Sequence, residues 1–496
     1  MRALNRTTWG TDGLAALAYA VDVRTVVRHL GQISIAIAGL MLVPAVFAAV
    51  AGESTMAAAS LGVSVLLGSG GTAASRLRAS PTVRSHEALA IITIAFAIAA
   101  GAALLPLLAA RVPFWDALFE AVSAVTSTGL STVANIEARS DSYKFTRAWA
   151  QWMGGLGFAI LGIALATSST VADRHLASGQ AQSDNLVSNT RAHMHKILSI
   201  YAGLTFAGWI TMMAVGMDAF PALLHALTAI STAGFSPYAE SIGAVEPRAA
   251  WIVLAVLMIC GAISFTVYGR AWRQGWRYLR EDSHLQFLFL AIIVLSTALF
   301  LTSHVNSAGR ALGWQDAAML AISAQTTTGL FTVSPSELDP ASKLVLIGSM
   351  LIGGDAGSTA GGMKIVRFLI LMRVIQLVVA RTAIPSHALS VRRLGPHRLE
   401  DQDAVNGLAV AVLYVLLPLV GWLPFLFYGH PPLDAFFDVV SAVTTTGLSA
   451  GVATTELEAP LKALFCTLML AGRVEIVAAI VVLRPRTWAG HPRSMD

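Results

Sequence analysis

One short segment occurs four times along this chain of 496 residues, and it limits the possible folds more than any other feature. Each copy is an amphipathic stretch that ends in Thr-Thr-Thr-Gly-Leu or a near copy of it, with long apolar runs on both sides. The copies occupy residues 116–130, 219–235, 316–330 and 434–448. A single copy would be an ordinary helix closed by a glycine. Four copies at near-regular spacing predict a quadruplicated unit, with four glycine-bearing loops around one axis.

The composition is typical of a membrane protein. Hydrophobic residues make up 55% of the chain and charged residues 12%, which is about half of the charged share in soluble domains. Ten windows are apolar enough to cross a bilayer. They lie at residues 32–51, 56–71, 87–110, 146–169, 194–216, 249–268, 285–304, 341–381 (interrupted), 404–428 and 460–483. We therefore predict an all-α polytopic membrane protein.

The first two spans stand apart, and the others form four groups of span, short segment and span. A short segment of about 13 residues reaches roughly 20 Å, too little for a hydrocarbon core about 30 Å thick. It must turn back, and irregular backbone survives at that depth only inside protein or beside water. We predict four pseudo-symmetric helix–pore-loop–helix repeats around one central pore, after an N-terminal helix pair. The expected boundaries are 1–80 for the pair and 81–180, 181–281, 282–398 and 399–496 for the repeats.

Basic residues gather in six short clusters between the apolar runs, which begin at Arg2, Arg76, Arg174, Arg270, Arg373 and Arg484. Such an excess marks the cytoplasmic side, so we expect both termini in the cytoplasm and no binding of nucleic acid. The cluster at Arg270, Arg273, Arg277 and Arg280 has helical spacing. It fits contact with anionic lipid or, alternatively, docking of a regulatory subunit. Cys260 and Cys466 lie in apolar runs and do not indicate a disulfide.

The end of each copy suits an ion filter. We name these segments glycine loops 1 to 4 (126–130, 231–235, 326–330 and 444–448). Potassium passes a filter when carbonyl oxygens replace its hydration shell, and glycine permits the positive φ and close approach that this requires. No carboxylate lies within the loops, so the ligands would be dipoles. The candidate K+ residues are Ser127, Thr128, Gly129, Thr232, Ala233, Gly234, Thr327, Thr328, Gly329, Thr445, Thr446 and Gly447.

Three further segments accompany the glycine loops: QWMGGLGFAILGIAL (151–165), IGGDAGSTAGGMKIVR (352–367) and MLAGRVEIVAAIVVL (469–483). With them, the chain from about residue 29 to residue 488 resembles the Trk-type membrane subunit of the Trk/Ktr/HKT superfamily of potassium transporters. The resemblance implies potassium preference, because Gly129 and not serine stands at the first filter position. It also implies a homodimer with one pore per subunit, and a cytosolic TrkA-like ring of nucleotide-binding regulatory chains as partner.

Residues 352–363 carry five glycines inside an otherwise apolar span. Each glycine costs a helix about 1 kcal/mol, so we predict an unwound loop at membrane depth. The resemblance implies a gating loop below the filter, with Gly353, Gly354, Asp355, Gly357, Gly361 and Gly362 as its residues. The alternative is a kinked helix without a gating role. A phosphate-binding loop is disfavoured, because Met363 separates Gly362 from Lys364 and no strand precedes the segment.

Arg473 lies about 13 residues into the last span, near mid-bilayer. An unpaired arginine there costs about 2.5–3.5 kcal/mol, so it needs a partner, and the carbonyls of loop 353–362 or the carboxylate of Asp355 would serve. The resemblance implies that Arg473 contacts the gating loop, and a bridge between helices is the alternative. Asp355 stands where the family pattern has a small uncharged residue. Glu475 points to another helix face, and we interpret it as structural.

Four aspartates, Asp116, Asp218, Asp316 and Asp434, begin the short segments. We expect them to cap the helices, with attraction of cations to a vestibule as a secondary role.

The sequence therefore predicts potassium uptake across the inner membrane, with K+ as the transported ion and no cofactor. The alternative is a secondary transporter that couples K+ or Na+ to H+ or Na+, for which Asp355 and Glu475 are the carboxylate candidates. An enzyme is not expected, because no nucleophile–base set, phosphate loop or zinc-binding HExxH is present in the sequence.

Overall fold

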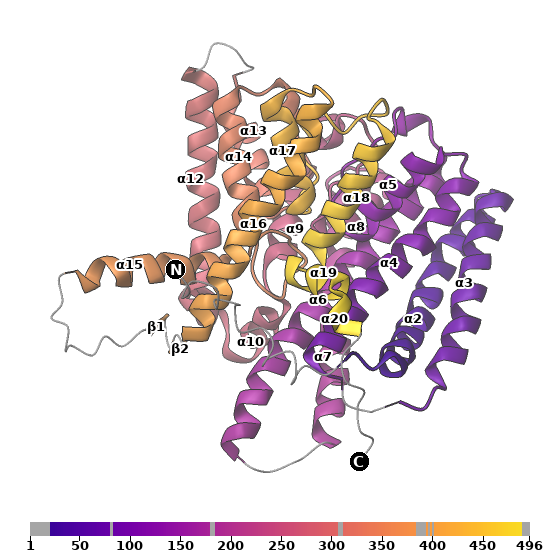
Figure 1. Cartoon of the computed structure of the whole chain (residues 1–496). Coiled ribbons are helices and arrows are strands. Elements are labelled where there is room, and N and C mark those ends of the chain that lie inside the picture. Colours follow the sequence, from indigo (N-terminus) through magenta and orange to yellow (C-terminus); the bar gives the residue numbers. More distant parts are fainter. Residues whose placement is uncertain are drawn as a thin grey trace, which may run out of the picture.

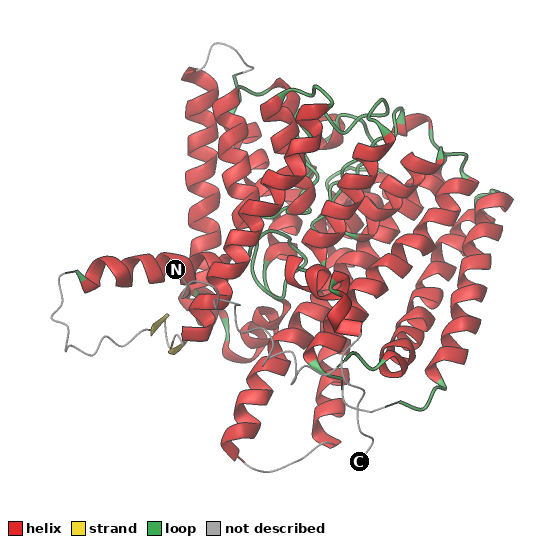
Figure 2. Ribbon diagram, viewed as in Figure 1, coloured by secondary structure: helices red, strands yellow, loops and turns green. Residues whose placement is uncertain are grey.

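The computed structural model describes residues 20–79, 83–178, 184–305, 311–382, 393–394, 397–398 and 401–488. This part of the chain is almost entirely helical (Figure 1, Figure 2). Six of its helices are long and apolar enough to cross a membrane, or eight if each of two bent pairs counts as one span. The predicted all-α polytopic fold is confirmed. Three expected repeat boundaries, at 80/81, 180/181 and 398/399, adjoin or fall within segments outside the described residues, as do Arg2 and the side chain of Arg174.

The helices of the N-terminal pair and the first two repeats follow one another in chain order. The pair is α2 (Val23–Val50) and α3 (Ser54–Ser75). Next come α4 (Ser85–Ala109), α5 (Phe114–Val125), η1 (Ile136–Ala138) and α6 (Asp141–Ser178). They are followed by α7 (Asp184–Ala214), α8 (Ala219–Ile230), η2 (Ser241–Ala244), α9 (Ala249–Ala262), α10 (Phe265–Gln274) and α11 (Trp276–Glu281).

The last two repeats have the same plan. The third contains α12 (Ser283–Val305), α13 (Trp314–Gln325), η3 (Pro335–Glu337), α14 (Pro340–Ile352) and α15 (Ile365–Arg381), which projects sideways from the bundle (Figure 1). Two short antiparallel strands, β1 (Arg393–Leu394) and β2 (His397–Arg398), precede the fourth. It contains α16 (Asp401–Phe427), α17 (Pro432–Val443), α18 (Ala459–Arg473), α19 (Ile476–Leu483) and α20 (Pro485–Trp488).

The short segments form helices of half the membrane thickness, as predicted. The half-length helices α5, α8, α13 and α17 have 12 residues each, or roughly 18 Å. The two ends of the described chain lie together, because the Val21 amide donates to the Thr487 carbonyl at 2.9 Å. Both ends are on the side of the bundle opposite the start of the half-length helices (Figure 1).

Two predicted spans, 249–268 and 460–483, are each broken into two helices. The first breaks between α9 and α10 at a 95° bend, and the second between α18 and α19 at a 111° bend. Apolar windows do not report such breaks, because a kinked span is as apolar as a straight one. The first break is stabilised by loop 353–362, whose Asp355 amide donates to the Ala262 carbonyl at 3.0 Å. That bond satisfies a helix-end carbonyl that water cannot reach.

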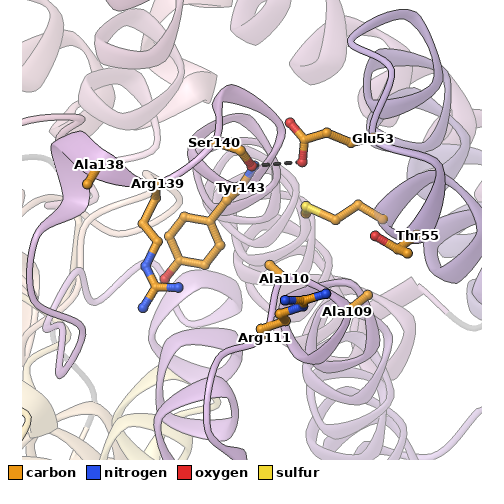
Figure 3. A pocket seen from close by; sticks show the side chains of 10 residues that line it. Glu53, Thr55, Ala109, Ala110, Arg111, Ala138, Arg139, Ser140 and Tyr143 are labelled. Carbon is orange, nitrogen blue, oxygen red and sulfur yellow. Dashed lines mark hydrogen bonds between the residues drawn. The ribbon is translucent and has the colours of Figure 1, made fainter.

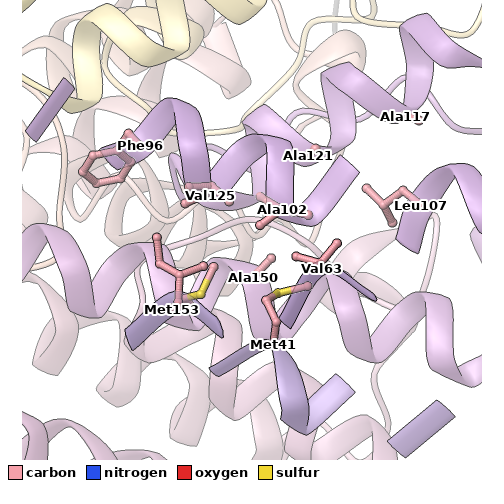
Figure 4. Packing of buried hydrophobic residues seen from close by; sticks show 14 of the residues in the cluster. Met41, Val63, Phe96, Ala102, Leu107, Ala117, Ala121, Val125, Ala150 and Met153 are labelled. Atoms are coloured by element: carbon pink, nitrogen blue, oxygen red, sulfur yellow. The ribbon is translucent and has the colours of Figure 1, made fainter. Parts of the chain in front are cut away.

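Glycines bring the two helices of the N-terminal pair close together. A Cβ atom on Gly31 of α2 would lie 2.7 Å from the Gly71 carbonyl oxygen of α3, so the two backbones approach closely. Such contacts are common where helices pack inside membranes. An apolar cluster packs this pair against the first repeat, and it includes Met41, Val63, Ala102, Leu107, Ala121, Val125, Ala150 and Met153 (Figure 4).

A cavity of about 290 Å³ opens between the N-terminal pair and the first repeat (Figure 3). Glu53 lies on one side and accepts a hydrogen bond from the Ser140 hydroxyl at 2.8 Å. Arg111, Arg139 and Tyr143 line the rest. None of the lining residues belongs to a glycine loop, so this cavity is distinct from the centre of the repeats.

Three of the aspartates expected to be helix caps lie inside the first helical turn instead. The N-cap residues of α5, α13 and α17 are Pro113, Gly313 and Pro431, and Asp218 of α8 makes no capping bond. Asp116 and Asp434 pair with lysines of other helices, because those lysines are buried and need a counter-ion. The two pairs, both with Nζ–Oδ1 distances of 2.6 Å, are Lys462 with Asp116 and Lys343 with Asp434.

We expect Asp116→Asn to lower the free energy of unfolding by about 3–5 kcal/mol, because it leaves Lys462 buried without its counter-ion. The measurement is thermal unfolding in detergent. Asp141→Asn is the matched control, since the Asp141 side chain is 64% exposed in its pair with Lys144 and exposed pairs contribute little. Equal melting temperatures for Asp116→Asn and the wild type would contradict this role.

Candidate functional site

Each half-length helix ends in the same hydrogen-bonded turn. In loop 1 the Thr128 amide donates to the Ser123 carbonyl (2.9 Å) and the Ser127 amide to the Ala124 carbonyl (2.9 Å), which is the Schellman pattern. The other three loops repeat both bonds. The residue in the left-handed conformation is normally glycine, but here it is Ser127, Thr232, Thr327 or Thr445, with φ of 54°, 46°, 52° and 50°. Hydroxyl residues that hold strained conformations at four equivalent positions indicate a functional requirement.

Hydroxyl pairs hold three of the loops in shape. Thr126 and Thr128 are joined through their Oγ1 atoms at 2.8 Å. The equivalent pairs are Thr326 with Thr328 at 2.7 Å and Thr444 with Thr446 at 2.8 Å. Loop 2 has Ser231 and Ala233 at these positions, and alanine offers no hydroxyl. The loops are therefore built alike but are not identical.

The four loop glycines form a closed ring. A Cβ atom on Gly129 would overlap the backbone of Gly234, and one on Gly329 would overlap the Thr446 carbonyl next to Gly447. A Cβ on Gly234 would lie 3.1 Å from the Thr328 carbonyl oxygen, and one on Gly447 would overlap the Thr128 carbonyl. Each glycine thus faces the next repeat in chain order, and the fourth faces the first. The ring places the four predicted loops around a common centre.

The helices that follow glycine loops 1, 2 and 4 each have a glycine in close contact with the preceding half-length helix. A Cβ on Gly154 of α6 would overlap the Val125 carbonyl at the end of α5, and Gly472 of α18 meets the Val443 carbonyl of α17 in the same way. Gly261 of α9 approaches the Ile230 carbonyl, where a Cβ would lie 2.5 Å away. These glycines were not among the predicted site residues, although Gly154 lies in the quoted segment 151–165. The pattern in the sequence that points to them is their similar distance from the preceding loop glycine.

Residues 353–362 form an unwound loop between α14 and α15, as predicted, which we name the intramembrane loop (Figure 1). Gly353, Gly357 and Gly362 have positive φ values of 71°, 77° and 72°. The loop is bonded to the broken end of α9, where the Thr359 amide donates to the Gly261 carbonyl at 3.1 Å. The Gln325 side-chain amide of α13 donates to the Gly353 carbonyl at 2.7 Å. The start of the loop at Gly353 and its second half at Thr359 are therefore both fixed by hydrogen bonds.

The intramembrane loop reaches the glycine loops at their deep end, where the half-length helices finish. The Gly361 amide donates to Thr327 Oγ1 at 2.6 Å, and the Gly362 amide donates to the Thr444 carbonyl at 3.1 Å. The Thr232 hydroxyl donates to Thr359 Oγ1 at 3.2 Å. Repeats 2, 3 and 4 are thus contacted directly by the loop.

Arg473 joins the loop to the remaining repeat. Its side chain is 1% exposed, and it donates to the Thr359 carbonyl at 2.8 Å and to the Ser127 hydroxyl at 3.1 Å. The guanidinium lies 4.1 Å from the centroid of the Phe158 ring. Lys364 lies over the same ring at 4.7 Å and donates to the Ala360 carbonyl. With Arg473 included, the loop engages all four repeats.

Of the two partners expected for Arg473, the carbonyls of loop 353–362 are confirmed by its bond to the Thr359 carbonyl, and the Asp355 carboxylate is wrong. Asp355 Oδ1 lies 2.9 Å from Nδ1 of His284, at the start of α12. Glu475 pairs with Arg367 of α15 at 2.8 Å. His284 and Phe158 were not predicted as partners, because each lies far from the loop in the chain and meets it only in the folded structure.

No group of three or more His, Cys, Asp or Glu is placed to hold a metal ion within the described ranges. The groups that surround the centre of the ring are peptide dipoles and hydroxyls. Such ligands suit a monovalent cation that binds and leaves quickly.

These features define the class of the protein: a polytopic all-α membrane protein whose half-length helices bring four glycine loops to one centre. The profile of the TrkH family, described as cation transport protein, matches residues 59–488. The chain belongs to this family.

Several proteins match this chain over most of its length, and one solved structure matches its fold. The Trk system potassium uptake protein TrkI of Halomonas elongata is 29% identical over 422 residues, which covers 82% of this chain and 85% of TrkI. The Trk system potassium uptake protein TrkH of Escherichia coli K12 is 26% identical over 484 residues, 94% of this chain and 99% of that protein. The crystal structure of the potassium transporter TrkH from Vibrio parahaemolyticus superposes with a TM-score of 0.81 at 24% identity, and the match covers 94% of this chain and all of that one.

Proposed function

We propose that this protein takes up potassium ions across the inner membrane through a filter formed by the four glycine loops. The observation that carries the proposal is the closed ring of Gly129, Gly234, Gly329 and Gly447. The names of the similar Halomonas and Escherichia proteins, which are potassium uptake proteins, support the choice of ion.

The backbone of the loops suits a row of carbonyl ligands. Along loop 4 the sign of φ alternates, from −85° at Thr444 to +50° at Thr445 and, after Thr446, to +94° at Gly447. Alternation of right- and left-handed residues turns successive peptide groups to the same side. The filter ligands are then the carbonyls and hydroxyls of the twelve predicted residues, which replace the water around K+. K+ is the transported ion, and the proposal needs no cofactor.

The intramembrane loop is the gate of this pore. Its residues and Arg473 contact every repeat at the deep end of the ring, so an ion that leaves the filter meets them next. Opening requires these bonds to break together. A regulator that favours the open state acts by its difference in affinity for the two states.

The wider assembly follows the family resemblance. The protein is a homodimer with one pore in each subunit, and both termini face the cytoplasm. A TrkA-like ring of nucleotide-binding chains binds on that side and controls the gate. The basic helices α10 and α11, which carry Arg273 and Arg280, provide contact with anionic lipid or with this partner.

Ion coupling is the competing function. Coupled transporters often use intramembrane carboxylates, and Asp355 and Glu475 are the candidates. Asp355 is paired with His284 and Glu475 with Arg367, so neither is held ready for a coupling ion. This observation favours the uncoupled pore.

Radioactive rubidium uptake into proteoliposomes tests the proposal. We expect uptake driven by the K+ gradient alone, without any gradient of protons or sodium. Liposomes without protein provide the background. Uptake that appears only when a proton or sodium gradient is imposed would replace the uncoupled pore by the coupled transporter.

A further inference from the structure

A second repeated feature lies behind the glycine loops, on the half-length helices themselves. Nine residues before the loop glycine stand Glu120 in repeat 1, His225 in repeat 2, Leu320 in repeat 3 and Asp438 in repeat 4. All four side chains are fully buried. Three of them are ionisable, and a buried ionisable group needs specific partners.

The partner is equivalent in three repeats: a serine two residues after the loop glycine, on the limb of chain that leaves the loop. The pairs are Ser131 with Glu120 at 2.5 Å, Ser236 with His225 at 3.2 Å and Ser449 with Asp438 at 2.7 Å. Each pair ties the outgoing limb to the helix that entered the loop. We name these contacts struts.

Asp438 forms the most complete strut. Besides the Ser449 hydroxyl, it accepts the amides of Ala450 at 2.5 Å, Val452 at 3.1 Å and Ala453 at 2.9 Å. Oδ2 receives three of these four donors and Oδ1 receives the Ala450 amide. Bonds from amides to an ionised acceptor are short and strong, so the outgoing limb of loop 4 is fixed over several residues.

Glu120 extends its strut to the neighbouring repeat. Oε1 accepts the Thr132 amide at 3.2 Å, and Oε2 lies 2.6 Å from Nε of Arg147. The Arg147 guanidinium also lies 3.7 Å from the centroid of the Phe235 ring, at the end of loop 2. One buried carboxylate thus holds loop 1 and, through Arg147, touches loop 2.

A second contact strengthens the same two repeats. The Gly129 amide donates to Ser123 Oγ, and the Gly447 amide donates to Ser441 Oγ, both at 3.0 Å. Repeat 3 differs, because Leu320 and Phe331 occupy the two strut positions. Its outgoing limb is bonded to η2 of repeat 2 instead, where the Phe331 amide donates to Ser241 Oγ at 3.2 Å. The ring is therefore held by carboxylate struts at repeats 1 and 4, by a histidine strut at repeat 2 and by the bond to Ser241 at repeat 3.

We propose that Asp438 and Glu120 are positioning residues that set the preference for K+ over Na+ by keeping the ring from contracting at repeats 1 and 4. Sodium is smaller than potassium, and a ring that cannot contract coordinates it poorly. The inference rests on the proposed function of the ring as a potassium filter. According to this inference, two side chains that do not contact the ion contribute to ion selectivity.

The test compares radioactive rubidium and radioactive sodium uptake in the same proteoliposome preparation. The ratio of the two does not depend on how much protein is folded, so a loss of stability alone leaves it unchanged. We expect Asp438→Asn to lower the rubidium-to-sodium ratio by about tenfold. The side-chain NH2 group of asparagine is a donor, so it cannot accept the hydrogen bonds that a carboxylate oxygen of Asp438 accepts. Ser449→Ala removes a single donor at a partly exposed position and should lower the ratio by about threefold.

Leu320→Met is the matched control, at the same helix position in the repeat that has no strut, and its ratio should equal that of the wild type. If the wild type carries rubidium in preference to sodium and both Asp438→Asn and Ser449→Ala keep that ratio, the struts have no part in selection. The proposed function then still stands. If the wild type carries no rubidium, the proposed function fails and this inference fails with it.

Discussion

Replacement of Arg473 by alanine should raise potassium flux through reconstituted protein by about tenfold or more. Arg473 makes two hydrogen bonds in this structure, to the Thr359 carbonyl and to the Ser127 hydroxyl, and in the proposed gate both must break on opening. Hydrogen bonds to a charged group contribute about 1.5–3 kcal/mol each, and every 1.4 kcal/mol shifts a population tenfold. Among the contacts described above, the two bonds of Arg473 are the only link between repeat 1 and the intramembrane loop, and the variant loses both. The open state therefore becomes more populated.

The measurement is rubidium uptake per reconstituted protein, without any regulatory partner. Arg484→Ala is the control, because Arg484 is exposed and lies beyond the end of α19. Arg473→Gln should give an intermediate flux, since glutamine can still donate one bond. Wild-type flux in both Arg473 variants, with normal elution from a sizing column, would remove Arg473 from the gate.

The repeats and their glycine loops could be predicted because their evidence is local. The motif that closes each half-length helix lies within about fifteen residues of sequence, and its length alone excludes a full span. The glycine-rich loop was also predictable, because five glycines between Gly353 and Gly362 cannot remain helical.

The contact of Arg473 with a carbonyl of loop 353–362 was predicted, but the other contacts that complete the site were not, because their partners are distant in the chain. Arg473 and Ser127 are 346 residues apart, and His284 and Asp355 are 71 apart. The pairing of Arg473 with Asp355 was a reasonable charge argument, yet His284 lies nearer to Asp355 once α12 is in place. The helix breaks before Phe265 and Ile476 could not be predicted for the same reason, since they depend on contacts with the intramembrane loop and the ring.

The struts show a middle case, in which the signal was present but was assigned to another role. Glu120, His225 and Asp438 stand at one register in the repeats, and the serines after the glycine repeat as well. The aspartates at the start of the helices have the pattern of helix caps, which is the more familiar role. The acids at the strut positions are distinguished by their place on the apolar face of a half-length helix, where an ionisable group needs a specific partner.

Replacement of Gly329 by serine should reduce rubidium uptake by at least about tenfold. Gly329 has a φ of +85°, and a Cβ there would overlap the Thr446 carbonyl and lie 3.0 Å from Gly447 Cα. The strain of an L side chain at positive φ is about 1–2 kcal/mol, and the overlap with a neighbouring backbone must push two loops of the ring apart. The carbonyls would then lie too far from a dehydrated ion to replace its hydration shell, so potassium should enter the filter less readily.

Gly451→Ser separates this effect from backbone strain. Gly451 has a φ of +101°, but a Cβ there meets nothing closer than Ser336 Cβ at 3.6 Å. Both variants thus carry a serine at positive φ, and only one of them intrudes on the ring. Rubidium uptake should fall in Gly329→Ser and stay near the wild-type level in Gly451→Ser. Equal uptake in Gly329→Ser and wild type would mean that ions do not cross at this ring. A ring of carbonyls cannot keep its dimensions when a side chain is inserted between two of its glycine loops.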